Sequence, residues 1–166
     1  MDPTGQQSVI LVGIGGSAAS ATALGWAAAE ARRRGAQLQV VRAWQPHPAR
    51  ALYAGTAGLR SELAAAERLN HDVRSVLGEA DGLDLVVQLI EGSAERILCE
   101  ASADADLLVL GSGSQSPVAQ ADPQITDRPV GPVIRACLSR ARCPIVIISP
   151  ASARRPHLAA LAYQLS

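Results

Sequence analysis

The sequence contains no lysine and no phenylalanine, and its aromatic residues are two tryptophans and two tyrosines. Without lysine the chain cannot use a lysine base, a lysine Schiff base or the lysine of a phosphate-binding loop. So few aromatics leave little to stack on a flavin. The 15 basic residues, all arginine, balance 15 acidic residues, so the formal net charge is zero. This balance removes the bulk electrostatic argument for a nucleic-acid or anionic-membrane partner.

The chain is also poor in metal-binding and cross-linking residues. Its cysteines are odd in number and form no C-x-x-C pair: Cys99, Cys137 and Cys143. We therefore expect no disulfide framework and no zinc site, and interpret the cysteines as reduced, buried side chains. The three histidines, His47, His71 and His157, lack metal-ligand spacing. With no secretion signal and no apolar run of about 20 residues, the sequence predicts a cytoplasmic protein.

The 166 residues, 48% of them hydrophobic, are enough to form one domain with a sizeable core. Short apolar runs predict five strands at 9–12, 38–44, 83–90, 106–110 and 145–148. Helical apolar spacing predicts helices over 18–34, 59–77, 94–101 and 134–141, with Ser17 and Ser93 as N-caps and Gly35 ending the first. Strands that alternate with helices predict an α/β fold with a parallel sheet between helical layers.

We expect residues 1–150 to form this domain and 151–166 to be a C-terminal extension. Within the extension, Leu158, Leu161, Ala162 and Leu165 have the spacing of a short amphipathic helix. The connections 45–58 and 115–129 are long, and long loops in such folds often border ligand sites.

Two glycine-rich turns follow the first and fourth predicted strands, at 13–17 and 111–114. Ligands of open α/β sheets bind at the carboxyl ends of strands, where glycines allow close approach and helix starts attract anions. A phosphate-bearing ligand is one interpretation, and tight turns without a ligand are the other. Gly13 to Ala18 also match the dinucleotide pattern G-x-G-x-x-A, although Arg42, Ala43 and Trp44 stand where its acidic residue belongs. A small NAD(P)- or nucleotide-dependent enzyme is therefore the alternative hypothesis.

The sequence resembles the universal stress protein family over residues 7–149. The resemblance is carried by Ile10–Ser17, the Ala-rich helix with Leu24 and Trp26, Glu91–Ala94, Ala105–Ser112 and Arg142–Ile147. It implies a five-stranded parallel sheet in the order 3-2-1-4-5, a Rossmann-like three-layer sandwich of the adenine nucleotide alpha hydrolase type. It also implies a homodimer formed through the last strand, at Ile145, Val146, Ile147 and Ile148.

Family members that bind ATP resemble the pattern G-x2-G-x9-G-[S/T] after strand four, with an acid at the end of strand one. Here Gly15 stands at the position of the acid, Ser114 at the second glycine and Pro132 at the Ser or Thr. About seven residues are inserted before Gly131. Proline has neither N–H nor hydroxyl, so two phosphate donors are lost together.

The sequence thus predicts a cytosolic stress-response binding protein that acts as a dimer, with a degenerate site that binds ATP or another adenine nucleotide weakly or not at all. At most a slow ATPase activity is expected, with no catalytic residue and no metal. The candidate nucleotide-binding residues are Gly13, Gly15, Ala43, Trp44, Gly111, Ser112, Gly113, Ser114, Gly131 and Val133.

Overall fold

The computed structural model describes residues 7–45, 56–79, 82–112 and 130–149. The predicted C-terminal helix, the candidate site residues Gly113 and Ser114, and both His47 and His157 lie outside these ranges.

Five strands form one sheet in the order β3-β2-β1-β4-β5. They are β1 (Val9–Gly13), β2 (Gln37–Trp44), β3 (Leu85–Glu91), β4 (Leu107–Gly111) and β5 (Ile145–Ile148). Every neighbouring pair is parallel. The predicted sheet and its strand order are confirmed.

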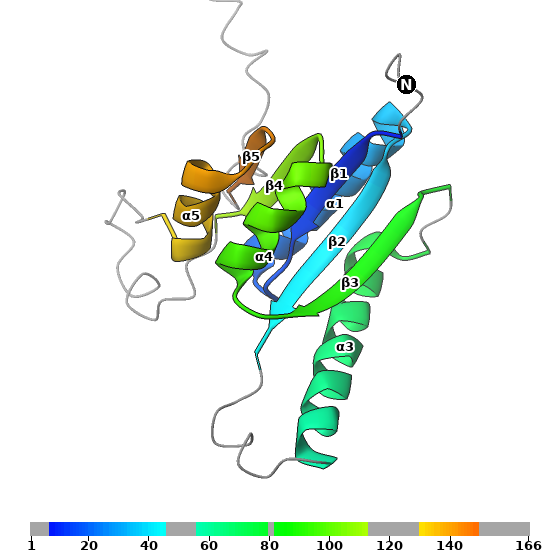
Figure 1. Ribbon diagram of the computed structural model, residues 1–166. Coiled ribbons are helices and arrows are strands. Elements are labelled where there is room, and N and C mark those ends of the chain that lie inside the picture. Colours follow the sequence, from blue (N-terminus) through cyan, green and yellow to red (C-terminus); the bar gives the residue numbers. More distant parts are fainter. Residues whose placement is uncertain (1–6, 46–55, 80–81, 113–129, 150–166) are drawn as a thin grey trace, which may run out of the picture.

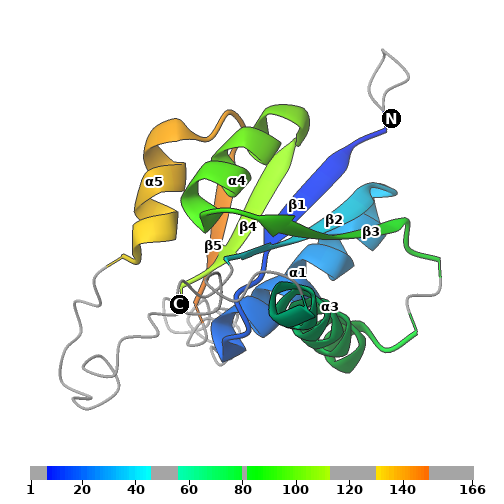
Figure 2. The same cartoon turned by 60° about the horizontal axis from the view of Figure 1, so that its bottom comes forward.

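Helices cover both faces of this sheet (Figures 1 and 2). One face carries α1 (Ala18–Arg34) and α3 (Thr56–Leu77). The other carries α4 (Ala94–Ala101), continued by the 3-10 turn η1 (Ser102–Asp104), and α5 (Pro132–Arg140). The three-layer α/β architecture is therefore the one that the sequence predicts.

The core consists of two apolar layers, one on each side of the sheet. Alternate residues of a strand point to opposite faces, so Ile10 and Val12 pack toward α1 and α3, whereas Leu11 packs toward α4 and α5. All three are fully buried. Each such side chain contributes roughly 1.5–3 kcal/mol to the free energy of unfolding.

Predicted helix signals are found at the expected positions. The Ser17 hydroxyl accepts from the Ser20 N–H, while the Ser20 hydroxyl accepts from the Ser17 N–H, which completes a reciprocal cap. Ser93 caps α4, and Gly35 ends α1 in the left-handed conformation. These caps fix where each helix starts relative to the strand before it.

Two apolar residues on predicted helix faces are exposed. Leu63 is 55% exposed because the N-terminal half of α3 extends past the end of the sheet (Figure 1), so the core contacts of this helix come from Leu69 and Val73 instead. Leu138 is 58% exposed, since α5 turns Ile134 and Cys137 toward the core. Among the described residues, no helix is long and apolar enough to cross a bilayer.

Candidate ligand site

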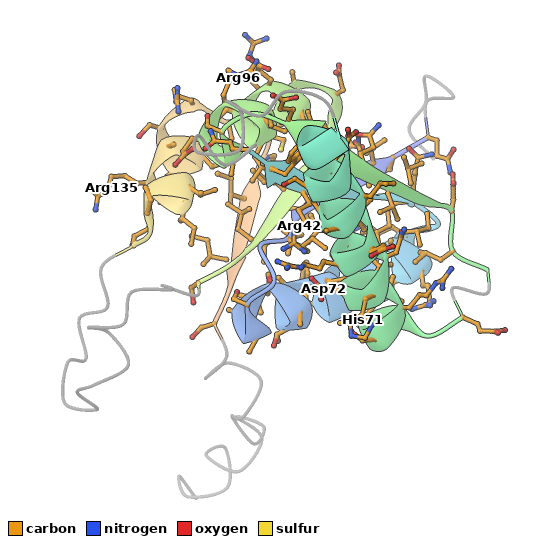
Figure 3. All side chains as sticks on the ribbon, turned by 90° about the horizontal axis from the view of Figure 1, so that it is seen from below. Arg42, His71, Asp72, Arg96 and Arg135 are labelled. Atoms are coloured by element: carbon orange, nitrogen blue, oxygen red, sulfur yellow. The ribbon has the colours of Figure 1, made fainter. Side chains whose placement is uncertain are left out.

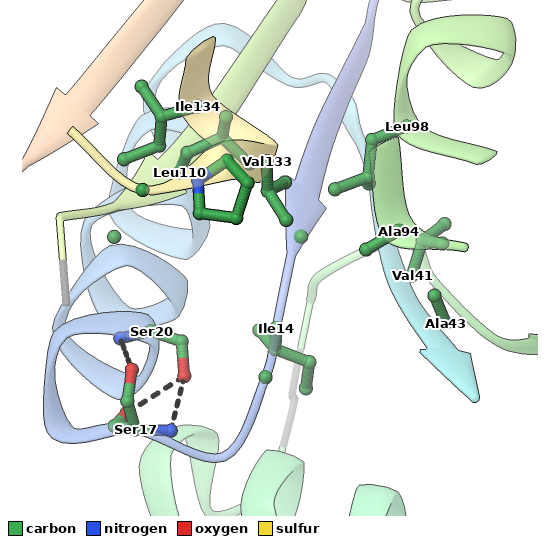
Figure 4. A pocket seen from close by; sticks show the side chains of 15 residues that line it. Ile14, Ser17, Ser20, Val41, Ala43, Ala94, Leu98, Leu110, Val133 and Ile134 are labelled. Atoms are coloured by element: carbon green, nitrogen blue, oxygen red, sulfur yellow. Dashed lines mark hydrogen bonds between the residues drawn. The ribbon is translucent and has the colours of Figure 1, made fainter. Parts of the chain in front are cut away.

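A pocket of about 280 Å³ lies at the carboxyl ends of β1, β2 and β4, between α4 and α5 (Figure 4). Gly13 and Gly111, where the two glycine-rich turns begin, both line it, because β1 and β4 are neighbours with Gly13 opposite Leu110. The pocket is lined by Gly13, Ile14, Gly15, Ser17, Ser20, Val41, Ala43, Ala94, Leu98, Leu110, Gly111, Gly131, Pro132, Val133 and Ile134.

The walls of this pocket are mostly apolar. Val41 and Ala43 come from β2, Leu98 from α4, and Val133 from α5. Among the described residues that line the pocket, none has a charged side chain. The flat face of an uncharged aromatic ring suits such walls better than a compact ion does, because burying it costs no desolvation of charge.

The lining contains two polar side chains, Ser17 and Ser20, which form the cap of α1. The Ser20 hydroxyl donates to the Ser17 carbonyl oxygen at 2.8 Å and also accepts from the Ser17 N–H, so it is fully engaged (Figure 4). Among the hydrogen bonds of the described residues, the Ser17 hydroxyl accepts but does not donate. Its proton is therefore the one side-chain donor that these residues can offer to a ligand in the pocket.

The N-terminus of α5 supplies further donors. Gly131 is the N-cap and has no side chain, while Pro132 occupies the first turn, so α5 begins two residues before the predicted helix. Within the described backbone, the first hydrogen bond of α5 runs from the Arg135 N–H to the Gly131 carbonyl oxygen. The N–H groups of Val133 and Ile134 come before it and have no intrahelical acceptor. Together with the helix dipole they favour an anionic group at this end of the pocket.

Of the ten candidate nucleotide-binding residues, six line the pocket: Gly13, Gly15, Ala43, Gly111, Gly131 and Val133. Trp44 and Ser112 do not. The N–H of Ser112, a candidate binding residue, donates to the Ile148 carbonyl oxygen at 2.8 Å, because β4 and β5 continue to pair at that point. Trp44 lies at the end of β2, where its carbonyl oxygen accepts from the Gly92 N–H.

Several lining residues were missed by the sequence reasoning, above all Val41, Ala94 and Leu98. They carry no chemical motif, so only their positions at strand and helix ends bring them to the pocket. Position 41, two residues before Ala43 on the same face of β2, is the one that strand periodicity signals.

A much smaller cavity, of about 50 Å³, lies on the other side of the turn after β1. It is bordered by Asp72 of α3, whose carboxylate accepts from the Arg42 guanidinium at 2.8 Å (Figure 3). Arg42 thus faces away from the larger pocket, whose walls include its neighbours Val41 and Ala43. In the described part of the chain, no three His, Cys, Asp or Glu side chains gather as a metal site would require.

The fold and this pocket define a small α/β protein with a cavity at the carboxyl ends of its central strands. The model of the universal stress protein family matches residues 8–149, and the chain belongs to that family.

Solved structures share the fold. The universal stress protein UspA from Lactobacillus plantarum is 21% identical, with a TM-score of 0.66, and the match covers 86% of this chain and 98% of that one. A universal stress protein in complex with cAMP is 24% identical, with a TM-score of 0.54 and coverage of 85% and 95%. The universal stress protein from Archaeoglobus fulgidus in complex with dAMP is 21% identical, with a TM-score of 0.56 and coverage of 86% and 98%.

Proposed function

We propose that this universal stress protein binds an adenine nucleotide in the pocket between α4 and α5, and that it holds the phosphate weakly. The observation that carries the proposal is the joining of an apolar cleft to an uncapped helix N-terminus in one cavity. The cleft suits the base, and the N–H groups of Val133 and Ile134, which have no acceptor among the described residues, suit a phosphate. Relatives solved with cAMP and dAMP support the choice of an adenine nucleotide.

Weak binding follows from two residues. Pro132 offers neither an N–H nor a hydroxyl at a position where the family pattern has Ser or Thr. Gly15 offers no carboxylate for the nucleoside. Each hydrogen bond to a charged group is worth roughly 1.5–3 kcal/mol. The loss of two such hydrogen bonds weakens binding by on the order of a hundredfold or more.

Isothermal titration of the full chain with cAMP, AMP and ATP tests this proposal. We expect dissociation constants of about 10 μM or weaker, that is, a binding free energy of roughly −7 kcal/mol or less in magnitude. Binding of none of the three at millimolar concentration overturns the assignment of the site. Submicromolar affinity for ATP contradicts the proposal that the site binds the phosphate weakly.

Gly15 makes a second test, one that relies on a gain of affinity. A Cβ at position 15 would have no heavy atom within 4 Å, so a side chain fits there. We expect Gly15→Asp to tighten AMP binding about tenfold, as one charge-assisted hydrogen bond does. Gly15→Ala, which adds a carbon without a carboxylate, is the matched control and leaves the affinity unchanged. Equal affinities of the two variants contradict the placement of the nucleoside beside Gly15.

The proposal includes a homodimer formed through β5 and a cytoplasmic location. β5 is an edge strand that pairs only with β4 in the sheet, and its Ile147 is 39% exposed. An apolar edge of this kind favours pairing with another strand. The three free cysteines support a reducing compartment.

Sedimentation of the full chain tests the dimer. We expect Ile147→Glu to yield a monomer, because it buries a carboxylate in the proposed contact. Leu63→Glu, which changes an equally apolar exposed residue on α3, is the control and leaves the dimer intact. A monomeric wild-type protein, or a dimeric Ile147→Glu variant, refutes the proposed interface.

A further inference from the structure

Two cysteines from different helices meet in the layer that covers one face of the sheet. Cys99 comes from α4 and Cys137 from α5, and their sulfur atoms lie 3.9 Å apart, with the Cys99 thiol donating to the Cys137 sulfur. They are 38 residues apart in sequence, so the contact depends on the packing of the two helices. No part of the proposed nucleotide site requires a thiol at either position.

The backbone around this pair is firmly held. The Ser102 hydroxyl, fully buried, donates to the Cys99 carbonyl oxygen at 2.7 Å and accepts from the Arg142 N–H at 3.0 Å. This residue therefore ties the end of α4 to the turn that follows α5. The two sulfurs face each other in a frame that keeps the helices side by side.

The two thiols differ in their surroundings. Cys137 is fully buried, and its burial, reinforced by the neighbouring Cys99, raises the pKa of its thiol to about 12. Cys99 is also buried but is 9% exposed. Of the two sulfurs, that of Cys99 is therefore the better placed to meet an oxidant, and that of Cys137 to react next with the oxidised Cys99.

We propose that Cys99 and Cys137 are a covalent modification site, at which a hydroperoxide converts the two thiols to a disulfide that joins α4 to α5. The Cys99 thiolate attacks the peroxide, the O–O bond breaks, and Cys99 becomes a sulfenic acid as the peroxide leaves as an alcohol or water. The Cys137 sulfur then displaces the sulfenic oxygen as water, forming the S–S bond. The two thiols together lose two electrons, and these reduce one peroxide.

The bond requires the sulfurs to close from 3.9 Å to about 2.05 Å. Leu98, next to Cys99, and Ile134, one turn before Cys137, both line the pocket. The disulfide therefore links the two walls of the ligand site. Burial makes the reaction slow, so we expect it to take minutes to hours and to be reversed by dithiothreitol.

Peptide mapping of the full chain tests the proposal. The reduced protein is treated with hydrogen peroxide at pH 7, its remaining thiols are blocked with N-ethylmaleimide, and it is cleaved after arginine. Arg135, Arg140 and Arg142 separate the three cysteines into three peptides. We expect one linked pair that joins the peptide of Cys99 to the peptide of Cys137, with Cys143 alkylated. Dithiothreitol should restore both thiols.

Three variants sharpen the result. Cys143→Ser should form the same linked pair, whereas Cys99→Ser and Cys137→Ser should form none within one chain. The chain oxidised in guanidinium shows that the reagents can form disulfides. A bridge that includes Cys143, conversion of Cys99 to sulfinic acid without a bridge, or no loss of thiol in the folded protein overturns the proposal. None of these readouts depends on nucleotide binding.

Discussion

Gly111, the last residue of β4, lies directly against the backbone of Ala19 in the first turn of α1. A Cβ at position 111 would overlap the Ala19 carbonyl group and would stand 2.7 Å from the Ser20 nitrogen. Its lack of a side chain therefore lets α1 start where it does. The glycine signal that suggests a ligand turn thus has a packing role as well.

We expect Gly111→Ala to destabilise the protein by about 1–3 kcal/mol, because backbone atoms must move to accommodate the methyl group. Urea unfolding of the variant measures the loss. Gly15→Ala is the matched control, since position 15 has open space around it. Similar unfolding free energies for the two variants would show that the close contact carries no such cost.

Substitutions at Gly131, the N-cap of α5, can distinguish effects on the stability of the helix from effects on its affinity for anions. Its φ of −59° and the open space around it accept a side chain. Gly131→Asp and Gly131→Asn should both stabilise the helix slightly, by about 0.5 kcal/mol, since each side chain can accept from a free N–H. Only the aspartate places a negative charge where a phosphate is proposed to lie.

Titration with AMP, paired with thermal unfolding, measures both effects for the two variants. We expect Gly131→Asp to lower AMP affinity at least tenfold more than Gly131→Asn does. Equal affinities would place the phosphate away from α5.

The short apolar runs predict the strands, because buried parallel strands are apolar on both faces, and the cap residues Ser17 and Ser93 carry local signals, whereas the strand order is implied by the family resemblance. The sequence read with this order places Gly13 and Gly111 in one pocket, since neighbouring parallel strands end at the same edge. It does not reveal that the Ser112 N–H pairs with Ile148, which depends on how far β5 extends. Nor does it show that Leu63 lies past the end of the sheet. Apolar periodicity identifies the apolar face of a helix but does not show which part of that face packs against the sheet.

Arg42 and Asp72 form an ion pair that attaches α3 to the end of β2. Their side chains are 17% and 35% exposed, so water screens the pair only in part. We expect a double-mutant cycle with Arg42→Met and Asp72→Asn to give a coupling energy of about 1 kcal/mol or more. The exposed pair Arg96 and Glu100, at 3.3 Å, is the control and should couple by less than about 0.5 kcal/mol. Equal coupling energies in both pairs would show that the pair of Arg42 and Asp72 does not stabilise the packing of α3 more than a surface ion pair does.

Glu30 gives the last prediction, which concerns pH. Hydrogen bonds from Arg33, and a further one from Arg34 at 2.5 Å, lower the pKa of its carboxyl from 4.5 to about 2. A carboxyl whose pKa is lower in the folded state stabilises the fold above its unfolded pKa, and this contribution is lost as the pH falls from about 4.5 to about 2. The stability difference between wild type and Glu30→Gln should therefore be constant above pH 5 and shrink below pH 4.5.

Urea unfolding between pH 3 and pH 7 measures this difference, and carbon-detected NMR gives the pKa of Glu30 directly. Glu62→Gln, at an exposed acid of α3, is the control for the loss of a surface carboxylate. High salt should reduce the effect at Glu30 by screening the arginines. An ordinary Glu30 pKa, or a stability difference that does not change with pH, would mean that the arginine contacts do not persist in solution.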